Sequence, residues 1–434
     1  MDRRASQGDH IAVLGLGKLG LPLTAAIASR GYTVSGWDVN PEIRERLLAG
    51  ECPIQEPDVE GCLDQYSAYL QWPATVHEVL QDATIVFIIV PTPSTAAGDF
   101  DAVWVRNALA DIWIAIDPET PPLVVIVSTL SPGTMGALAA MFPGLPLVYN
   151  PEFIALGSVI HDLLFPDFVL IGEAKAAGGD VLQNFYERFL LTEAPISRLS
   201  YINAELAKLC LNAFVTTKIS FSHEIGRICE GVPGADANVV LKAIGQDRRI
   251  GRQYLQCGPP FGGPCFPRDG RALRHAAEFA NANATLSEAV DQINQQRGME
   301  IIRTGKRYAA VLGLAYKPGT SVTEESFGML ASCALANQGW KVFCYDPLVK
   351  EAAREALPVG VHFPATVIQC VAGADLVIVA TPCPEFASIP PDAFQRGGNK
   401  PTLIDCWGMF DKPEYHAVTD YRRIGRGPDN AKAP

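Results

Sequence analysis

The sequence predicts an α/β protein in which two doubly wound parallel-sheet domains are joined by a central helical domain. A strand–turn–helix–strand pattern occurs twice, once near each end of the chain, and both copies contain the run Ala-Val-Leu-Gly-Leu. The middle of the chain instead carries long helical patterns. With 434 residues the chain is also too long for a single hydrophobic core, so two or three domains are expected.

The two copies of the pattern occupy residues 10–41 and 308–347. In each copy an apolar strand ends in a glycine turn, a helical stretch follows, and a second strand ends in an aspartate. A third apolar strand, closed by Thr-Pro, follows at 82–93 and again at 374–382. Strand–helix–strand units of this length imply parallel strands with right-handed crossovers.

The region between the copies is predicted to be helical. Residues 203–230 contain no glycine or proline before Gly226 and carry apolar residues at helical spacing. Residues 285–304 show the same spacing, with Thr285 or Ser287 as the expected N-cap. The predicted domains are therefore an N-terminal sheet domain at 1–199, a central helical linker and dimerisation domain at 200–299, and a C-terminal sheet domain at 300–434. The last dozen residues, or part of them, are expected to form a loose tail.

Composition and charge exclude several classes of partner. Lys and Arg total 35 and Asp and Glu total 47, a net charge of −12, which argues against nucleic acid or an anionic membrane as the main partner. No segment reaches the roughly 18 apolar residues that a membrane span needs. The eleven cysteines include no C-x-x-C pair, so we expect mostly buried thiols in a reducing, cytoplasmic compartment and no metal site.

A dinucleotide-binding turn is predicted in the first copy, whose "GLGKLG" has G-x-G-x-x-G spacing. The three glycines provide a sharp turn, a close approach of backbone to pyrophosphate, and helix–strand packing in a Rossmann-like fold. Asp38 ends the next strand, where a carboxylate suits the ribose hydroxyls of NAD and repels the extra phosphate of NADP. The residues predicted to bind NAD here are Gly15, Gly17, Lys18, Leu19, Gly20 and Asp38.

The second copy has lost this fingerprint. Its "GLAYKPGT" offers Gly313 without the other glycines, and supplies Lys317 instead. A pyrophosphate bound there would contact a point charge and backbone N–H groups. The duplication therefore predicts two ligands, a dinucleotide and a nucleotide-linked substrate.

The segment "FGGPCFPRDG", residues 261–270, places Cys265 among glycines and prolines. Gly263-Pro264 and Phe266-Pro267 both interrupt regular backbone pairing, so the segment is predicted to be an irregular loop rather than a helix or a central strand. Irregular loops on a rigid scaffold often carry chemistry. Cys265 is thus a candidate for the chemistry of the site, whereas the other ten cysteines are interpreted as inert thiols.

Taken in order, the motifs of this chain resemble those of the UDP-glucose/GDP-mannose dehydrogenase family. The resemblance covers about residues 10 to 415 and rests on "GLGKLGLP", "VPTP" at 90–93, "VSTLSPGT" at 127–134, "NPEF" at 150–153, "AELAKLCLNAF" at 204–214, "DRRIG" at 247–251, "GGPCFPRD" at 262–269 and "GLAYKP" at 313–318. Members oxidise the C6 alcohol of a nucleotide sugar to a carboxylate with two NAD⁺ and a cysteine nucleophile, and are commonly homodimers or larger.

The resemblance assigns roles to particular residues. Cys265 would form a thiohemiacetal and then a thioester, because an aldehyde itself does not easily give up a hydride. Lys208 and Asn212, one helical turn apart, would stabilise the developing oxyanions. Asp269 would hold the lysine and a water, and Thr129 and Glu152 would position and activate the hydrolytic water. Thr92, Ser128 and Thr129 are added to the NAD contacts.

The resemblance also implies the substrate. The expected contacts to the nucleotide sugar are Phe153, Ile154, Ala155, Leu156, Lys208, Asn212, Arg249, Tyr254, Phe261, Gly262 and Lys317, with Arg249 reaching into a neighbouring subunit. The first choice is UDP-glucose to UDP-glucuronate, a reaction that often feeds polysaccharide biosynthesis. The alternatives are a GDP-mannose or UDP-N-acetylhexosamine 6-dehydrogenase, or a catalytically weak nucleotide-sugar-binding relative. An ordinary two-electron 3-hydroxyacid dehydrogenase would need neither Cys265 nor a second nucleotide-type domain.

The sequence departs from the family pattern at four places. Leu156 replaces a glutamate, Arg268 replaces a lysine, and Glu324 stands where an arginine is expected. Trp407 or Gly408 occupies another position where arginine is common. The six residues to which the resemblance gives catalytic roles are all present.

Overall fold

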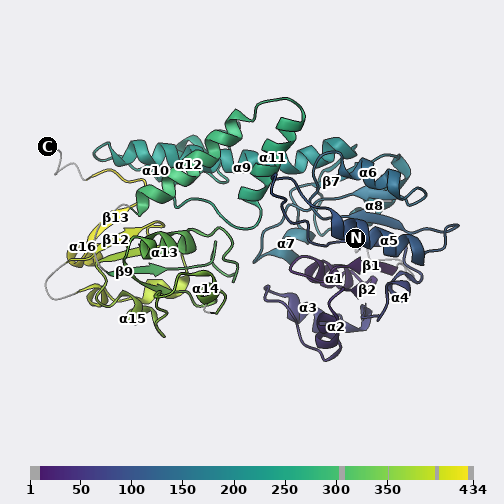
Figure 1. Ribbon diagram of the computed structural model, residues 1–434, viewed down its shortest axis with the longest axis horizontal. Helices are drawn as coiled ribbons and strands as arrows, with labels where there is room; N and C mark the ends of the chain where they lie inside the picture. The colour runs from purple at the N-terminus through teal and green to yellow at the C-terminus, as the bar shows by residue number, and fades with distance from the viewer. Residues whose placement is uncertain (1–9, 303–307, 350, 396–399, 429–434) are drawn as a thin grey trace. The chain divides into compact units, whose positions relative to one another are not determined.

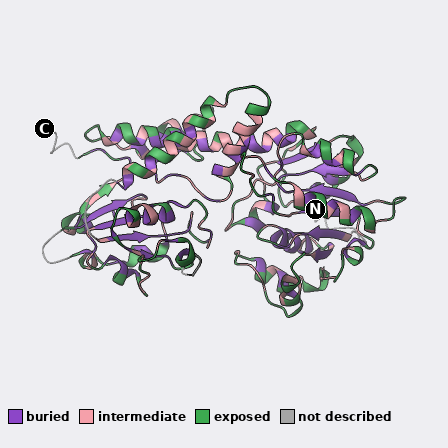
Figure 2. Ribbon diagram, in the orientation of Figure 1, coloured by how far each residue is buried: buried purple, intermediate pink, exposed green. Residues whose placement is uncertain are grey.

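The computed structural model describes residues 10–302, 308–349, 351–395 and 400–428. The chain divides into two compact units, Met1–Cys210 and Leu211–Pro434 (Figure 1). Each unit contains one β-sheet whose strands are largely buried (Figure 2). The predicted α/β fold with two doubly wound sheets and a helical central region is confirmed.

The first unit is built on a sheet of eight strands within the described residues, in the order β3-β2-β1-β4-β5-β6-β7-β8. The strands are β1 (His10–Leu14), β2 (Thr33–Trp37), β3 (Leu70–Gln71), β4 (Ile85–Ile88), β5 (Leu123–Ile126), β6 (Leu147–Tyr149), β7 (Val169–Glu173) and β8 (Ile196–Ser200). The helices are α1 (Gly20–Ser29), α2 (Pro41–Leu48), α3 (Val59–Gln65), α4 (Val76–Leu80), α5 (Val103–Ala115), α6 (Thr134–Met141), α7 (Val159–Leu164) and α8 (Ala176–Phe189), with a short 3₁₀ turn η1 (Ser67–Tyr69).

One strand pair departs from the predicted parallel arrangement. β6 and β7 are antiparallel, with Val148 opposite Glu173 and Tyr149 opposite Gly172, whereas β7 and β8 are parallel. The segment that leaves β6 runs through a loop and α7 and returns in the opposite direction, so no right-handed crossover separates these two strands. The sheet is therefore parallel from β3 to β6 and mixed beyond it.

The second unit has a parallel sheet of five strands within the described residues, in the order β10-β9-β11-β12-β13. The strands are β9 (Tyr308–Leu312), β10 (Lys341–Tyr345), β11 (Leu376–Val379), β12 (Thr402–Asp405) and β13 (Asp420–Arg423). Its helices are α10 (Ala237–Ile244), α11 (Phe266–Phe279), α12 (Thr285–Ile301), α13 (Phe327–Asn337), α14 (Glu351–Ala356), α15 (Val367–Val371) and α16 (Pro413–Val418), with 3₁₀ turns η2 (Pro384–Ser388) and η3 (Pro391–Phe394).

The two sheets have the same strand order around their central strands. β1 lies between β2 and β4, and β9 lies between β10 and β11. Alternate residues of each central strand belong to different hydrophobic clusters. In β1, Ile11 and Val13 belong to one cluster and Ala12 and Leu14 to another. Each sheet is therefore covered on both faces. Beside β1 and β9 the chain changes the direction in which it adds strands to the sheet. Open α/β sheets bind ligands at such switch points.

The helix α9 (Tyr201–Glu230) has 30 residues and continues from the first unit into the second. It confirms the helix predicted over 203–230. Its stretch without glycine lets one unbroken helix carry both Lys208 and Asn212, one turn apart on the same side.

Two local predictions were wrong, and a third holds at most for part of its segment. Helix α12 begins at Thr285 after Ala284, and no side chain caps it: Ser287 lies inside the helix and donates to the Gly270 carbonyl. The second half of the cysteine segment is the first turn of α11, because a proline in the first turn removes an N–H that has no helical partner anyway. The chain is not loose from β13 to Pro428, since Gly425 N–H donates to Glu230 and Gly427 N–H donates to the Ala235 carbonyl. Residues 429–434 of the predicted tail lie outside the described part.

Candidate active site

The turn after β1 has the geometry of a pyrophosphate site. Gly15 has φ +95°, and a Cβ there would lie 2.1 Å from the Ile89 carbonyl oxygen. A Cβ at Gly20 would lie 1.8 Å from the Gly15 carbonyl oxygen. Gly17 differs, because a Cβ there would meet nothing within 4 Å. Packing therefore requires the outer two glycines, whereas the space above Gly17 stays open for a ligand.

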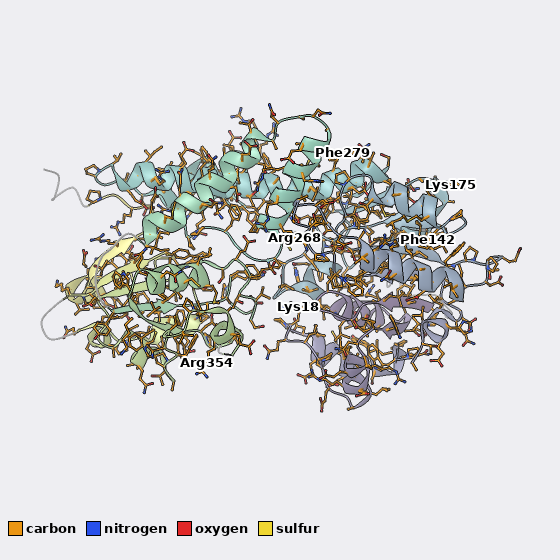
Figure 3. All side chains as sticks on the ribbon, viewed as in Figure 1. Lys18, Phe142, Lys175, Arg268, Phe279 and Arg354 are labelled. Carbon is orange, nitrogen blue, oxygen red and sulfur yellow. The ribbon has the colours of Figure 1, made fainter. Side chains whose placement is uncertain are left out.

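Asp38 follows β2 and faces this turn. Its Oδ2 accepts a hydrogen bond from Leu16 N–H at 2.8 Å, and its Oδ1 accepts one from Asn40 N–H at 2.9 Å. The side chain remains half-buried, so the carboxylate can still accept from ribose hydroxyls. Lys18, labelled in Figure 3, is exposed beside Gly17, and Leu19 packs against the core. These residues fit NAD.

The turns after β4 and β5 are joined by Ser128. Its hydroxyl donates to the Val90 carbonyl at 2.7 Å and accepts from Val90 N–H at 3.0 Å. Thr92 is buried, and Thr129 is half-buried directly after Ser128. The buried Glu205 of α9 accepts from Gly133 N–H at 2.7 Å and from Met135 N–H at 2.6 Å. The Thr129 segment is thereby tied to the helix that carries Lys208.

Glu152 lies three residues beyond β6, half-buried against α8 and α9. The Tyr186 hydroxyl donates to its Oε1 at 3.0 Å, and Lys208 Nζ donates to its backbone carbonyl at 2.6 Å. Burial raises the pKa of Glu152 to about 7, although the Tyr186 hydrogen bond and the Lys208 charge both lower it. A carboxyl with this pKa can accept or release a proton near neutral pH.

Lys208 is held between backbone and an aromatic ring. Its side chain is buried, and Nζ lies 4.6 Å from the ring centroid of Phe153. Phe153 in turn pairs with Phe168, with ring centroids 4.8 Å apart. The ammonium is thus restricted in position at the start of the predicted sugar-binding segment.

The predicted sugar-binding segment continues beyond Phe153 to Gly157. Two carboxylates fix its backbone: Glu56 accepts from Gly157 N–H at 2.6 Å, and Asp162 accepts from Ala155 N–H at 3.1 Å. Ile154 and Leu156 pack against the hydrophobic core of the first unit, and Ala155 is exposed. Leu156, the departure from the family glutamate, is therefore part of the packing of this unit.

In the second unit, Cys265 is exposed immediately before α11. Asp269, in the first turn of that helix, is buried, and its Oδ2 accepts a hydrogen bond from Asn212 Nδ2 at 2.6 Å. Arg268 lies beside it, with Nε 3.7 Å from Asp269 Oδ1, and Figure 3 labels this arginine. The structure therefore brings Asn212 into contact with Asp269, which lies one helical turn after Cys265.

The other cysteines are poorly suited to form thiolates. Burial raises the pKa of every one of them, to about 11 for Cys257 and to about 12 for Cys344 and Cys383. Of the eleven, only Cys210 and Cys265 are exposed. Exposure, loop position and a neighbouring buried polar pair together favour Cys265 as the reactive thiol.

The cysteine loop rests on the turn that follows β9. Gly263 N–H donates to the Glu324 carbonyl at 2.9 Å, and a Cβ at Gly262 would lie 2.1 Å from the Glu325 carbonyl oxygen. Gly263 also packs against the ring of Tyr316, the residue before Lys317. The structure therefore brings Phe261, Gly262 and Lys317 to the same edge of the second sheet.

Aromatic rings flank the start of α11. Phe266 makes edge contacts with Tyr254 and Phe261, with centroids 6.1 Å and 6.2 Å away. Tyr254 is 51% exposed and has φ +61°, an uncommon backbone conformation for a bulky residue. Arg249 lies on an exposed turn and pairs with Asp247 at 2.7 Å.

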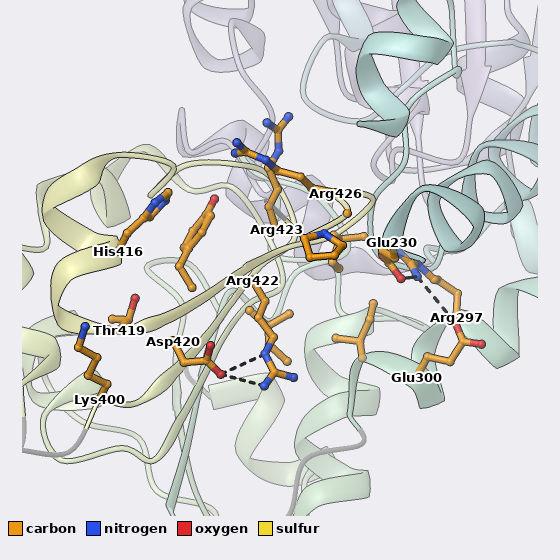
Figure 4. A pocket seen from close by; sticks show the side chains of 16 residues that line it. Glu230, Arg297, Glu300, Lys400, His416, Thr419, Asp420, Arg422, Arg423 and Arg426 are labelled. Carbon is orange, nitrogen blue, oxygen red and sulfur yellow. Dashed lines mark hydrogen bonds and ion pairs between the residues drawn. The ribbon is translucent and has the colours of Figure 1, made fainter. Parts of the chain in front are cut away.

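A pocket of about 870 Å³ lies elsewhere in the second unit (Figure 4). Its described lining contains none of the predicted site residues and is rich in charge. Arg297 pairs with Glu230 at 2.7 Å, Arg422 pairs with Asp420 at 2.8 Å, and Arg423 pairs with Asp411 at 3.2 Å. Because its arginines are already paired with carboxylates, we do not assign the chemistry to this pocket.

Comparison with known proteins identifies the family. Sequence models of the UDP-glucose/GDP-mannose dehydrogenase family match three consecutive parts of the chain: the NAD binding domain over residues 9–190, the central domain over 202–296 and the UDP binding domain over 310–412. The chain belongs to this family. It is an NAD-dependent oxidoreductase of the nucleotide-sugar 6-dehydrogenase type, and its cofactor is NAD.

Individual relatives of this dehydrogenase family support the same assignment. UDP-glucose 6-dehydrogenase YwqF of Bacillus subtilis is 30% identical, over 96% of this chain and 98% of that protein. GDP-mannose 6-dehydrogenase of Pseudomonas putida is also 30% identical, over 93% and 97%. The solved UDP-glucose dehydrogenase of Pyrobaculum islandicum superposes with a TM-score of 0.87 at 30% identity, covering 98% of this chain and 99% of that one. Relatives of equal identity thus carry names with different substrates.

No helix among the described residues has the length and apolar character to span a bilayer. No group of three or more His, Cys, Asp and Glu side chains gathers there to hold a metal ion.

Sequence reasoning missed four residues that shape the site. Tyr186 and Asn150 contact each other and lie beside Glu152, Glu205 caps α6, and Gly328 packs α13 on the turn after β9. Glu205 and Asn150 lie within motifs quoted for the family, "AELAK" and "NPEF". Tyr186 and Gly328 carry no local signal, because their partners are distant in sequence.

Proposed function

We propose that this protein oxidises the C6 hydroxyl of UDP-glucose to a carboxylate, forming UDP-glucuronate in a four-electron reaction with a thiohemiacetal and a thioester on Cys265. The observation that carries the proposal is the 2.6 Å hydrogen bond from Asn212 to Asp269. It joins the first turn of the cysteine helix to α9, one turn from Lys208. Within α9, Asn212 and Lys208 are four residues apart, so both can serve one reaction.

The first oxidation requires stabilisation of an alkoxide. Lys208 supplies a buried cation and Asn212 supplies an amide donor from the same side of α9, and both suit an oxygen that gains negative charge. Each of the two oxidations would need its own NAD⁺ as hydride acceptor, so NADH would be exchanged for NAD⁺ at the turn after β1 between them. The Asp269 carboxylate orients the Asn212 amide, because it accepts one of the two N–H groups of that amide.

Cys265 makes the second oxidation feasible. Its sulfur adds to the aldehyde carbon, the carbonyl oxygen becomes the thiohemiacetal oxygen, and loss of the second hydride leaves a thioester. The position immediately before α11 puts the sulfur near the N–H groups of a helix start, which favour a thiolate.

Hydrolysis of the thioester is assigned to Glu152 and Thr129. Glu152 takes a proton from water as the water attacks the thioester carbon, and the Cys265 sulfur leaves as a thiolate. With a pKa of about 7, Glu152 is half ionised near neutral pH, mostly ionised above it and mostly protonated below it. The hydrolytic step should therefore slow as the pH falls below about 7.

The expected domains and assembly belong to this proposal. NAD is placed in the domain at 1–199, and the nucleotide part of the substrate is placed beside Lys317 in the domain at 300–434. The domain at 200–299 is proposed to form a homodimer. Its support is a stripe of exposed apolar residues seven positions apart on α9, namely Phe214, Phe221 and Ile228. All eleven cysteines are free, which suits a reducing cytoplasm.

A panel of nucleotide sugars tests the substrate. UDP-glucose, GDP-mannose and a UDP-N-acetylhexosamine are each incubated with protein and NAD⁺, and NADH and sugar acid are quantified. We expect UDP-glucose to give two NADH per acid. Faster turnover of another sugar would reassign the substrate, and binding without NADH from any sugar would favour the catalytically weak relative.

Cys265→Ser tests the covalent step. The variant should lower acid formation by at least ~10³-fold. Cys210→Ser is the matched control, because it removes the other exposed thiol, and it should leave acid formation unchanged. Acid formation at the normal rate by Cys265→Ser would rule out covalent catalysis.

A further inference from the structure

Tyr186 is a buried residue of α8 whose hydroxyl contacts two acceptors. Its Oη lies 2.5 Å from Asn150 Oδ1 and 3.0 Å from Glu152 Oε1. The ring is fixed by Phe185 and Phe189, with centroids 5.4 Å and 6.0 Å away. A tyrosine hydroxyl has one proton to donate, so it can satisfy only one of these oxygens at a time.

The orientation of Asn150 is set from its other side. Its Nδ2 donates to the Leu170 carbonyl at 2.9 Å, and a carbonyl can only accept. The amide oxygen must therefore face Tyr186. Asn150 is buried, so its oxygen depends on the Tyr186 hydroxyl for a donor.

These contacts define two complete arrangements. When Glu152 is protonated, its carboxyl can donate to Tyr186 Oη, and Tyr186 can donate to Asn150. When Glu152 is ionised, the carboxylate is the stronger acceptor, so Tyr186 turns its proton to Glu152. The Asn150 oxygen then loses its donor, which is a cost for a buried polar atom.

We propose that Tyr186 is a positioning residue that switches its hydroxyl proton between Asn150 and Glu152, so that the site accommodates both protonation states of this carboxyl. The functional meaning rests on the base role proposed for Glu152. The hydroxyl holds the ionised carboxylate in place for water activation. Asn150 competes for the same proton and thereby favours the protonated form.

The surroundings of Glu152 agree with this switch. The charged and titratable groups that face it are Tyr186 from α8 and Lys208 from α9. Burial raises the pKa of Glu152 to about 7, and burial also raises that of Tyr186 well above its usual value. Tyr186 therefore stays protonated while Glu152 titrates, as a switching donor must.

The two partners predict shifts of opposite sign. Tyr186→Phe removes the donor to the carboxylate, and a hydrogen bond to a charge is stronger than one to a neutral acid. The Glu152 titration should move up by about one pH unit. Asn150→Leu removes the competing acceptor, so the titration should move down. Tyr201→Phe is the control, because it deletes a hydroxyl that donates to the Leu147 carbonyl in the same unit.

The test measures Glu152 directly. The carboxylic C=O stretch is followed by infrared difference spectroscopy against pH, with the spectrum of Glu152→Gln subtracted to isolate this group. We expect a midpoint near pH 7 for the unmodified protein and for Tyr201→Phe, with the opposite shifts in the other two variants. A midpoint unchanged by Tyr186→Phe would overturn the proposal, even if Asn150→Leu does not fold.

Turnover separates this inference from the proposed function. If Glu152 is the base, the acid limb of kcat moves with the infrared midpoint. A midpoint that shifts while the kcat limb stays in place would support the role of Tyr186 and refute the role of Glu152.

Discussion

The turns after β1 and β9 begin from the same framework and diverge in what they carry. Each starts with a glycine at positive φ, +95° at Gly15 and +89° at Gly313. In each, a helix glycine packs on the carbonyl of the first: a Cβ at Gly20 would lie 1.8 Å from Gly15 O, and one at Gly328 would lie 2.0 Å from Gly313 O. The duplication thus extends to the contact that joins strand and helix.

The difference lies in the residues between those glycines. Four residues separate Gly15 from Gly20, and Gly17 among them is open to a ligand. Fourteen separate Gly313 from Gly328, and backbone from this longer turn supports the cysteine loop. The first turn leaves Gly17 open for a cofactor, whereas the second supports the loop of Cys265, the proposed nucleophile.

The aspartates that follow the second strands differ in the same way. Asp38 is half-buried and makes one hydrogen bond through each oxygen. Asp346 is only 3% exposed, and it accepts from Leu314, Ala315 and Leu348 N–H groups at 2.8 to 3.1 Å. The first is available to a ribose, and the second is used to shape the turn.

The largest effect should come from the paired helix glycines. Gly20→Ala and Gly328→Ala each force a methyl group into a backbone carbonyl, so each should lower the free energy of unfolding by about 3 kcal/mol. Gly136→Ala is the control, because its Cβ would meet nothing within 4 Å in α6. Denaturant unfolding measures all three. If Gly328→Ala is as mild as the control, the two turns are not equivalent.

The support of the cysteine loop predicts a loss of rate. Gly262→Ala would displace the loop from the Glu325 carbonyl, and a misplacement of about 1 Å should lower kcat about 100-fold. The KM for NAD should stay unchanged. Gly258→Ala is the matched control, since its nearest neighbour atom would be 4.0 Å away. An unaltered kcat in Gly262→Ala would contradict the supporting role of the second turn.

Replacing each aspartate by alanine should weaken NAD binding at Asp38 and lower the free energy of unfolding at Asp346. Asp38→Ala should raise the KM for NAD about tenfold, because the ribose hydroxyls would lose their carboxylate acceptor. Asp346→Ala leaves the buried N–H groups of Leu314 and Ala315 without their acceptor and should cost about 2 kcal/mol or more of stability. Steady-state kinetics and unfolding are compared for both. A raised KM for NAD in Asp346→Ala would contradict the claim that Asp346 only shapes its turn.

The smallest effect should be at Glu325, which pairs with Arg271 of α11 at 2.7 Å and has φ +48°. Arg271→Ala should cost less than about 1 kcal/mol, since the pair is partly exposed. Glu325→Gly loses the same pair but relieves the backbone, so its stability should be nearly unchanged. A large loss in both variants would show that the ion pair, not the backbone contact, holds the cysteine loop.

The cofactor turn was predictable because its signals are local. Gly15, Gly17, Gly20 and Asp38 stand at fixed spacings set by one turn and one crossover. Gly328 was hidden by the longer insertion, although its packing repeats that of Gly20. Tyr186 was missed because its bond to Glu152 spans 34 positions of sequence, and only packing of α8 on the sheet brings them together.

The cysteine segment remains a predicted site, and its prediction as a loop throughout was wrong. Two prolines indicated irregular backbone, yet a proline in the first turn is compatible with a helix start. That geometry matters, because it places Asp269 in the first turn where it reaches Asn212. Asn212 and Asp269 were named from the sequence, and the start of α11 at Phe266 explains how their side chains come into contact.

The central claim, a covalent sugar intermediate on Cys265, is tested most directly by peptide mass mapping. Glu152→Gln is incubated with NAD⁺ and with the nucleotide sugar that the unmodified protein oxidises fastest. Slowed hydrolysis should leave the sugar attached as a thioester to the peptide that contains Cys265. An unmodified Cys265 in a variant that still forms sugar acid, or an adduct on a different residue, would contradict the account.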